Sequence, residues 1–252
     1  MQPIQLTSLC YALQGKPLLS DLTVTLCARR IGLIGRNGSG KTTLMRLIAG
    51  LIAPSSGTVR LGDLDPYSDR KVALARIGIL FQNPDHQILF PTVEEELAFG
   101  LLQQGQSQSA AFGRANDMLT AEGRTDWAKA PISTLSHGQK QWLCLQAVLL
   151  MGPETLLLDE PFAALDEITR FRLDIRLREL WLERGMTVIF VTHSITEAAF
   201  LADRAVVLTR KGGGIKMDRR LALPEIRRNE LRASPEFGRE MEALLAAMEE
   251  ES

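Results

Sequence analysis

The sequence has few of the features that would assign it to several large classes of protein. Its three cysteines, Cys10, Cys27 and Cys144, lie far apart without a CxxC pair, which argues against a disulfide framework or a zinc site. No run reaches the ~18 apolar residues that a membrane-spanning helix needs, and the first residues lack the basic and apolar regions of a signal peptide. We therefore expect a soluble chain that reaches a membrane only through a partner.

Charge of either sign is also not in excess. Lys and Arg number 29 against 30 for Asp and Glu, which gives a formal net charge of -1. Such a chain has no overall field that attracts nucleic acid, so we expect no nucleic-acid partner. With 252 residues it is long enough to bury a sizeable core.

The hydrophobic pattern is typical of an α/β protein. Short apolar runs at 30–34, 76–82, 155–159 and 187–191 predict strands, and the last two flank an amphipathic helix at 166–184, which predicts a right-handed βαβ crossover. We divide the chain into a main unit at 1–210 and a loosely packed C-terminal appendage at 211–252. Within the unit, 1–90 and 151–210 form the core, with two or three antiparallel strands in 1–30, and 91–150 forms a helical subdomain.

A glycine-rich segment lies between the predicted strand at 30–34 and a helical pattern. Residues 35–42 fit G-x-x-x-x-G-K-[ST], whose glycines let backbone N–H groups surround phosphate oxygens at a helix N-terminus. In this motif Lys41 reaches the β- and γ-phosphates and Thr42 binds magnesium. A glycine turn with a solvated lysine is the alternative, which the later motifs disfavour.

Two carboxylates, Asp159 and Glu160, follow the apolar strand at 155–158. This places them at the carboxyl edge of a parallel sheet, where open α/β folds bind ligands. Asp159 would hold magnesium through water and Glu160 would polarise the attacking water. The alternative is a helix cap formed by Asp-Glu-Pro, and the phosphate loop favours the catalytic interpretation.

Six motifs in order make the sequence similar to ATP-binding-cassette ATPases over residues 1 to about 210. They are the Walker A loop at 35–43, the Q-loop Gln82, the signature at 135–139, Walker B at 156–160, the D-loop at 164–166 and the switch histidine His193. The resemblance implies an α/β P-loop NTPase fold, with a mixed, largely parallel core sheet, an N-terminal antiparallel β-subdomain and an inserted helical subdomain. It also implies ATP and Mg²⁺ as ligands.

The resemblance assigns a role to individual residues. It implies Glu160, His193 and Gln82 as catalytic residues, and Thr42, Gln82 and Asp159 as metal-binding residues. The nucleotide-binding residues that it implies are Tyr11, Gly35, Arg36, Asn37, Gly38, Ser39, Gly40, Lys41, Thr42, Thr43, Ser136, Gly138, Gln139 and Asp166.

Three of these positions have a second interpretation, and one further position in the signature departs from the family pattern. Tyr11 would stack on adenine, or it is an ordinary strand tyrosine. Asp166 would line the dimer seam, and it is equally well explained as a helix N-cap. His193 alone would be interpreted as a residue at the end of a strand. In the signature, His137 replaces the glycine of LSGGQ.

The resemblance implies a second ATPase subunit, identical or a paralogue, because the signature binds the γ-phosphate held by the opposite subunit. It also implies a transmembrane coupling subunit and a substrate-binding membrane component, which hold the ATPase at the cytoplasmic face of the cell membrane. Residues 1–165, with 81–100 the most typical stretch, resemble the ATPases of energy-coupling-factor importers of vitamins and transition metals. Within them, 29–43 and 136–151 look most like biotin-transport ATPases. From residue 166 onward the chain is more similar to ATPases of nitrate, sulfonate and taurine importers.

Two other classes remain as alternatives. The first is a non-transport ABC protein that acts as a scaffold, against which Glu160 and His193 argue. The second is another P-loop enzyme, such as a small-molecule kinase, which has no use for the signature at 135–139.

Overall fold

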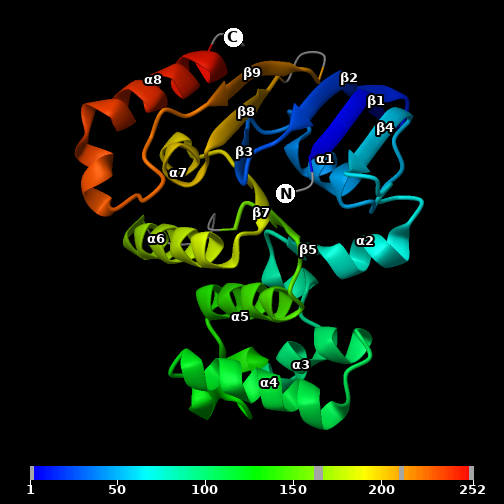
Figure 1. Ribbon diagram of the computed structural model, residues 1–252, viewed down its shortest axis with the longest axis vertical. Coiled ribbons are helices and arrows are strands. Elements are labelled where there is room, and N and C mark those ends of the chain that lie inside the picture. Colours follow the sequence, from blue (N-terminus) through cyan, green and yellow to red (C-terminus); the bar gives the residue numbers. More distant parts are fainter. Residues whose placement is uncertain (1–2, 162–166, 210–212, 250–252) are drawn as a thin grey trace.

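A computed structural model describes residues 3–161, 167–209 and 213–249 of the chain. The described residues form a six-stranded sheet and a three-stranded sheet at one end of the molecule and a group of helices at the other (Figure 1). Among the described helices, none is both long and apolar enough to cross a membrane.

The larger sheet has the order β5-β6-β7-β3-β8-β9. Its first five strands run parallel to their neighbours and β9 pairs antiparallel with β8. Its strands are β3 (Arg30–Ile34), β5 (Ile77–Leu80), β6 (Thr155–Asp159), β7 (Thr187–Thr192), β8 (Arg204–Leu208) and β9 (Ile215–Arg220). The four strands predicted from apolar runs are therefore present, and β6 and β7 are parallel neighbours joined through a helix, as predicted.

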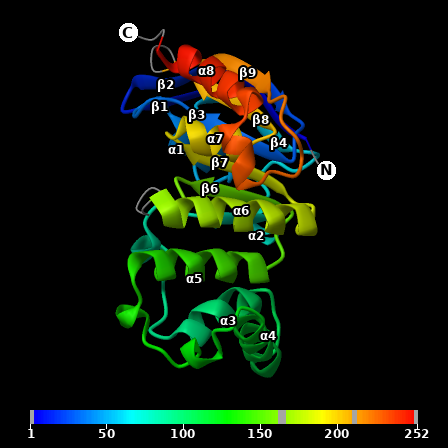
Figure 2. The ribbon, with the colours of Figure 1, turned by 90° about the vertical axis from the view of Figure 1, so that its left-hand side faces the viewer.

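Both faces of this sheet are covered, which explains the continuous apolar runs. On β7, Val188 and Phe190 belong to one core, whereas Ile189 and Val191 belong to the core on the other face. The first core includes α6 (Glu167–Arg184), α7 (Ile195–Leu201) and α8 (Pro235–Glu249), and the second includes α1 (Lys41–Ile48). Figure 2 shows α8 lying across the end of the molecule that carries the sheets.

The smaller sheet is antiparallel, with the order β2-β1-β4. It consists of β1 (Ile4–Leu13), β2 (Lys16–Leu26) and β4 (Ser56–Leu61), so one of its three strands lies beyond the predicted range of 1–30. Leu6, Leu22 and Val59 bury one face of this sheet in the core that also contains α1. The short helix α2 (Arg70–Arg76) then leads into β5.

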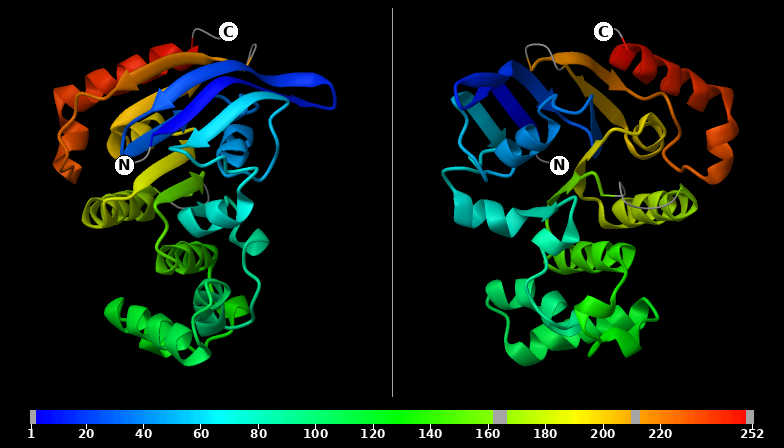
Figure 3. Two further views of the ribbon diagram at one scale, coloured as in Figure 1. Left: turned by 45° about the vertical axis from the view of Figure 1, so that its right-hand side comes forward. Right: turned by 180° about the vertical axis from the view of Figure 1, so that it is seen from behind.

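The helical region consists of α3 (Val93–Gln103), α4 (Gln108–Ala121) and α5 (His137–Leu150), with short 3₁₀ helices η1 (Pro84–His86), η2 (Thr125–Trp127) and η3 (Ile132–Thr134). Figure 3 shows these helices grouped away from the two sheets. Val93, Leu97 and Leu119 form a separate small core with Leu143 of α5, while Cys144 of α5 belongs to the main core. Helix α5 therefore joins the two regions.

The expectation of a loosely packed C-terminal appendage is wrong for the described residues. Strand β9 extends the main sheet, and Phe237 and Leu244 of α8 are buried in the main core at 1 % and 0 % exposure. The 3₁₀ helix η4 (Asn229–Ala233) connects these two elements. The charged sequence misled the prediction because the buried apolar residues of α8, such as Phe237 and Leu244, stand among charged residues, while Leu245 is 44% exposed.

Candidate active site

Four loops meet at the carboxyl edge of the parallel strands. β3 leads into the phosphate loop at 35–40, β5 leads to Gln82, β6 ends at Asp159 and is followed by Glu160, and β7 leads to His193. Because β5, β6, β7 and β3 are successive neighbours, residues far apart in sequence come together there, as the ligand-binding edge of an open α/β sheet requires.

The phosphate loop has the backbone conformation that its glycines allow. Gly38 and Gly40 have φ angles of 84° and 88°, in the left-handed region that favours glycine. A Cβ atom at Gly40 would also lie only 2.7 Å from Cδ2 of Leu19. The loop then leads into α1 at Lys41, so backbone N–H groups and the positive end of the helix dipole face the same space.

Lys41 is folded over this loop. Its Nζ donates hydrogen bonds to the carbonyl oxygens of Gly35 at 2.7 Å and Arg36 at 3.0 Å. Burial lowers the pKa of Lys41, and the nearby charges of Glu160 and Asp159 oppose that shift. A phosphate group in the loop would add the negative charge that a buried ammonium group needs.

A cavity of about 360 Å³ opens in front of the loop. It is lined by Leu18, Asn37, Gly38, Gly40, Lys41, Thr42, Thr43, Gln82 and Glu160. The hydroxyl Oγ of Ser39, inside the loop, is buried and has no hydrogen-bond partner among the described residues. An unpartnered hydroxyl in a glycine loop, beside a buried lysine, fits a bound polyphosphate.

Oxygen atoms from three loops lie close together beside this cavity. The Thr42 hydroxyl donates a hydrogen bond of 3.0 Å to Oδ1 of Asp159. Gln82 donates through Nε2 to Glu160, which leaves its amide oxygen available as a ligand. Burial raises the pKa of Asp159, and the hydrogen bond from Thr42 opposes this shift. Hydroxyl, carboxylate and amide oxygens are the ligands that Mg²⁺ prefers, so these residues fit that ion.

Glu160 is the residue on which the other catalytic candidates converge. Its Oε2 accepts a hydrogen bond from Nε2 of Gln82 at 3.1 Å and lies 3.3 Å from Nδ1 of His193. Its φ angle is 45°, an uncommon conformation for a residue other than glycine, and its N–H is bonded to Val191 O on β7. The other carboxylate oxygen, Oε1, therefore remains able to accept a proton from water.

Comparison with known proteins identifies the family. Residues 19–163 match the family described as ABC transporter. The chain belongs to the ABC transporter family. Within that family it is an ATP-binding subunit, an ATPase.

Curated relatives of this ABC protein match most of its length. The biotin transport ATP-binding protein BioM of Rhodobacter capsulatus is 44% identical over 218 residues, which is 86% of this chain and 90% of BioM. The energy-coupling factor transporter ATP-binding protein EcfA2 of Halalkalibacterium halodurans is 37% identical over 212 residues, covering 81% of this chain and 75% of EcfA2.

A solved structure supports the ABC ATPase fold over almost the whole chain. It is CbiO1 of Clostridium perfringens, described as part of the ABC transporter complex CbiONQ, with a TM-score of 0.78 and 27% sequence identity. The match covers 96% of this chain and 95% of CbiO1. It therefore includes the C-terminal segment with β9 and α8.

The ABC signature lies at the start of α5 and outside the cavity of its own chain. Ser136 caps the helix: its Oγ accepts from Gln139 N at 3.3 Å, and Gln139 Oε1 accepts from Ser136 N at 2.7 Å. Ser136 and His137 are exposed, Gly138 is partly exposed, and none of them lines the phosphate-loop cavity. The helix N-terminus is formed, but it contributes no residue to the lining of this cavity.

Two nucleotide-binding candidates are not brought to the cavity in the described chain. Tyr11 on β1 is partly buried against the core beneath the antiparallel sheet, and Leu18 of β2 lines the cavity instead. Asp166 lies outside the described residues. The roles given to Tyr11 and Asp166 stay predictions.

Sequence reasoning missed Leu18 and Glu197 near the site. Nothing in the sequence distinguishes Leu18 from other strand leucines. Ser194 and Glu197, in contrast, have the spacing of a capping box after the switch histidine, and Ser194 Oγ does accept from Glu197 N at 3.2 Å. That pattern predicts a helix start, but it gives no indication that Glu197 is 5% exposed.

Proposed function

We propose that this protein is the ATPase subunit of an energy-coupling-factor importer for biotin. The observation that carries the proposal is the 44% identity to BioM over 218 residues. A match of that length necessarily includes part of the chain after residue 165, the part whose sequence pattern favoured nitrate, sulfonate and taurine importers. Transition-metal import is the nearest alternative, because the pattern of residues 81–100 resembles importers of vitamins and of transition metals alike.

For hydrolysis, the geometry gives each residue at the carboxyl edge a task. Lys41 and the loop N–H groups bind the phosphates of ATP, and Thr42, Asp159 and Gln82 would hold Mg²⁺. When bound, Mg²⁺ neutralises charge that develops on the phosphate oxygens. Glu160 accepts the proton of the attacking water through Oε1, while Gln82 and His193 fix its other oxygen at 3.1 and 3.3 Å.

His193 has a further donor available. Its imidazole is 54% exposed and contacts Glu160 through Nδ1, so Nε2 remains available to the γ-phosphate. We infer that His193 lies between Glu160 and the γ-phosphate of bound ATP and contacts both.

The position of the signature supports a dimer of ATPase subunits. Because Ser136, Gly138 and Gln139 do not line the cavity of their own chain, a second subunit must supply them to the bound ATP. The N–H groups and dipole at the start of α5 would then face the γ-phosphate. The second subunit is a second copy or a paralogue, and the nucleotide closes the two head to tail.

The membrane partners follow from the same proposal. A transmembrane coupling subunit and a small substrate-binding membrane protein would hold the ATPase at the cytoplasmic face of the cell membrane. Leu89, 68% exposed between Gln82 and α3, lies on the surface that we propose for the coupling subunit. Closure of the ATPase dimer would move that partner.

The test is a pull-down of tagged full-length protein from detergent-solubilised membranes of its own host, washed with ATP and analysed by mass spectrometry. Recovered complexes are then assayed for binding of radiolabelled biotin. A biotin-binding membrane protein together with a coupling subunit is the expected result. A cobalt- or nickel-binding component, a nitrate- or sulfonate-type permease, or no membrane partner would overturn the assignment to biotin.

A further inference from the structure

A second polar cavity lies behind the loop that carries His193. It has a volume of about 200 Å³ and is lined by Arg170, Phe171, Asp174, Ser194, Thr196, Glu197 and Arg232. It shares no lining residue with the cavity at the phosphate loop. Its lining joins α6, the start of α7 and the C-terminal η4, so it lies where three elements meet next to the switch histidine.

Glu197 connects this cavity to both neighbours of His193. The Thr192 hydroxyl donates a hydrogen bond of 2.8 Å to Oε2 of Glu197, and Ser194 N donates to the same Thr192 hydroxyl at 3.0 Å. The backbone N–H of Glu197 donates to Ser194 Oγ at 3.2 Å. Together these three bonds link Thr192 and Ser194, on either side of His193, to Glu197 and so hold the backbone of His193.

In the part of the chain that the structure describes, few contacts fix the imidazole of His193. It is 54% exposed, and the contact that the described structure gives it is Glu160 at 3.3 Å. The direction of the ring is therefore set mainly by the backbone at residues 192–194. Errors of about 1 Å in the placement of such a group can lower a rate ~100-fold.

We propose that Glu197 is a positioning residue for ATP hydrolysis: its buried side chain fixes the turn at residues 192–194 and thereby holds His193 against Glu160. The proposal rests on the catalytic role given to His193 above. Glu197 touches neither the nucleotide cavity nor Glu160, so it acts through His193.

The environment of Glu197 favours the neutral acid, which is suited to such a role. Burial, and next the charge of Asp174, raise the pKa of Glu197 to about 8, and the bond from Thr192 opposes the shift. Arg170 of α6 opposes it and Glu160 adds to it, while Arg232 of η4 pairs with Asp174 at 2.7 Å. A neutral carboxyl group accepts from Thr192 without placing another negative charge near Glu160.

The bond with Thr192 and the N-terminal cap of α7 use different atoms of Glu197, so a substitution can remove one and keep the other. The cap uses the backbone N–H of residue 197, which any substitution except proline retains. Glu197→Gln keeps an oxygen for Thr192 and imitates the neutral acid, whereas Glu197→Ala removes only the side-chain link. Thr192→Val removes the same bond from its other end with little change of shape, together with the bond that Ser194 N donates to the Thr192 hydroxyl.

The experiment measures steady-state ATP hydrolysis by the full-length chain and by Glu197→Ala, Glu197→Gln, His193→Ala and the double variant His193→Ala with Glu197→Ala. We expect Glu197→Ala to lower kcat by about 10-fold or more with KM for ATP within about 2-fold, because the phosphate loop is untouched. Glu197→Gln should stay within about 3-fold of the wild type. The double variant should be no slower than His193→Ala alone.

A matched control separates positioning from general stability. Glu240 is equally buried, at 4% exposure, but pairs with Arg219 at 2.8 Å next to β9. Glu240→Ala should lower Tm and leave kcat near the wild-type value. If Glu197→Ala does not fold, Thr192→Val supplies the same measurement.

The outcomes distinguish the two roles. An unchanged kcat in His193→Ala would overturn the role of His193 itself. A loss in His193→Ala with a normal kcat in Glu197→Ala and Thr192→Val would overturn only the positioning role. The positioning role would also be overturned if the losses of kcat in the two single variants multiplied in the double variant. A Glu197→Gln enzyme as slow as Glu197→Ala would lead to the same conclusion.

Discussion

Thr42 and Asp159 are 117 residues apart in the chain, and the hydroxyl of one donates a 3.0 Å hydrogen bond to the carboxylate of the other. Asp159 ends β6, and Thr42 lies in the first turn of α1, which follows β3 through the phosphate loop; β3 and β6 are separated in the sheet by β7. The bond therefore crosses the sheet edge between strands that are not neighbours. It brings a hydroxyl and a carboxylate oxygen together, and both are ligands that a hard divalent ion accepts.

Asp159→Asn should weaken the response to magnesium. The amide carries no negative charge, so the Mg²⁺ concentration for half-maximal ATP hydrolysis should rise by about 10-fold or more, while the fold is retained. A magnesium titration of activity at saturating ATP measures this. Asp117→Asn, an exposed position on α4, is the control; equal magnesium responses in the two variants would contradict the assignment of Asp159.

Glu160→Gln should bind ATP and fail to hydrolyse it. The amide keeps the shape of the side chain but cannot take a proton from water, so kcat should fall by ~10²–10⁴. The affinity for ATP, measured by equilibrium titration, should stay within about 3-fold because Lys41 and the loop are unchanged. Glu154→Gln, at the exposed start of β6, should behave as the wild type, and turnover by Glu160→Gln near the wild-type rate would rule out Glu160 as the base.

The parts of the fold that the sequence pattern predicted share a physical cause. β3, β6 and β7 are buried on both faces, so each appears in the sequence as an apolar run. The phosphate loop is also recognisable, because few other structures require its glycine-rich composition. β9, with the sequence IKMDRR, is an edge strand whose last three residues are exposed, and it lacks that pattern. Its pairing with β8 therefore could not be predicted from local sequence.

The residues of the candidate active site could also be predicted in part from the sequence. Glu160 and His193 were identified because motif order and strand ends place them at one sheet edge. The charged neighbours of Glu197 are harder to predict. Asp174 lies on α6 and Arg232 on η4, and both come close to Glu197 only through packing. Buried polar contacts between distant segments have no periodicity that a sequence can display.

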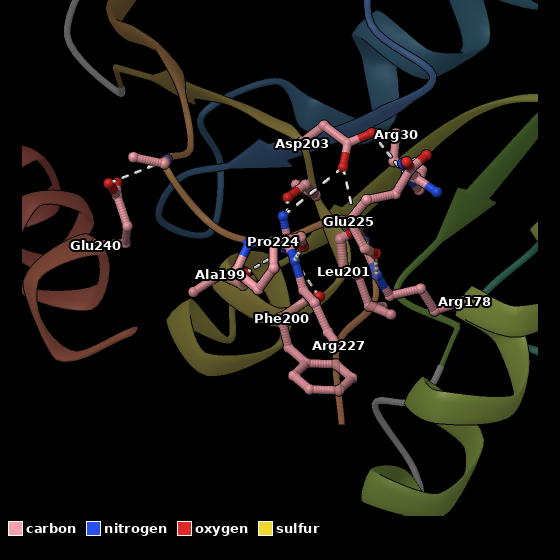
Figure 4. Close-up of polar contacts among 12 residues, drawn as sticks. Arg30, Arg178, Ala199, Phe200, Leu201, Asp203, Pro224, Glu225, Arg227 and Glu240 are labelled. Carbon is pink, nitrogen blue, oxygen red and sulfur yellow. Dashed lines mark hydrogen bonds and ion pairs between the residues drawn. The ribbon is translucent and has the colours of Figure 1, made fainter. Parts of the chain in front are cut away.

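Arg227 is the clearest of these long-range contacts, and its removal should destabilise the protein. Its Nη1 donates to the carbonyl oxygens of Ala199, Phe200 and Ala202 at the end of α7, within a cluster that also contains Arg178 and Asp203 (Figure 4). Burial, and next the charge of Arg178, lower the pKa of Arg227 to about 9, so it remains charged at neutral pH.

Arg227→Met should therefore lower the free energy of unfolding by about 2–4 kcal/mol, because carbonyl groups at a helix end and the Asp203 carboxylate lose a buried partner. Urea titration of the full-length chain measures the loss. The neighbouring Arg228 is exposed, and Arg228→Met should change the same quantity by less than about 0.5 kcal/mol. Equal free energies of unfolding for Arg227→Met and Arg228→Met would show that the hydrogen bonds from Arg227 to the end of α7 contribute nothing to stability.

Stability should also depend on pH through Glu197. Its ordinary pKa of 4.5 is raised to about 8 in the folded chain, where Asp174, Arg170, Arg232 and Glu160 are the charged groups around it. Between these two values the folded chain holds a proton that the unfolded chain releases. The contribution of this group to stability is therefore most favourable below pH 4.5 and falls as pH rises to 8.

Glu197→Gln removes this titration and leaves that of Asp174, whose pKa is raised to about 6, in both proteins. Relative to the wild type, the variant should gain stability steadily as pH rises from 5 to 8 and level off above 8, as measured by urea unfolding at several pH values. Glu240→Gln is the control, because the bond from Arg219 lowers the pKa of Glu240 and its contribution is lost only as pH falls below 4.5. A difference between Glu197→Gln and the wild type that stays flat from pH 5 to 8 would mean that Glu197 is ionised in the folded protein, and that its bond to Thr192 is one made to a carboxylate.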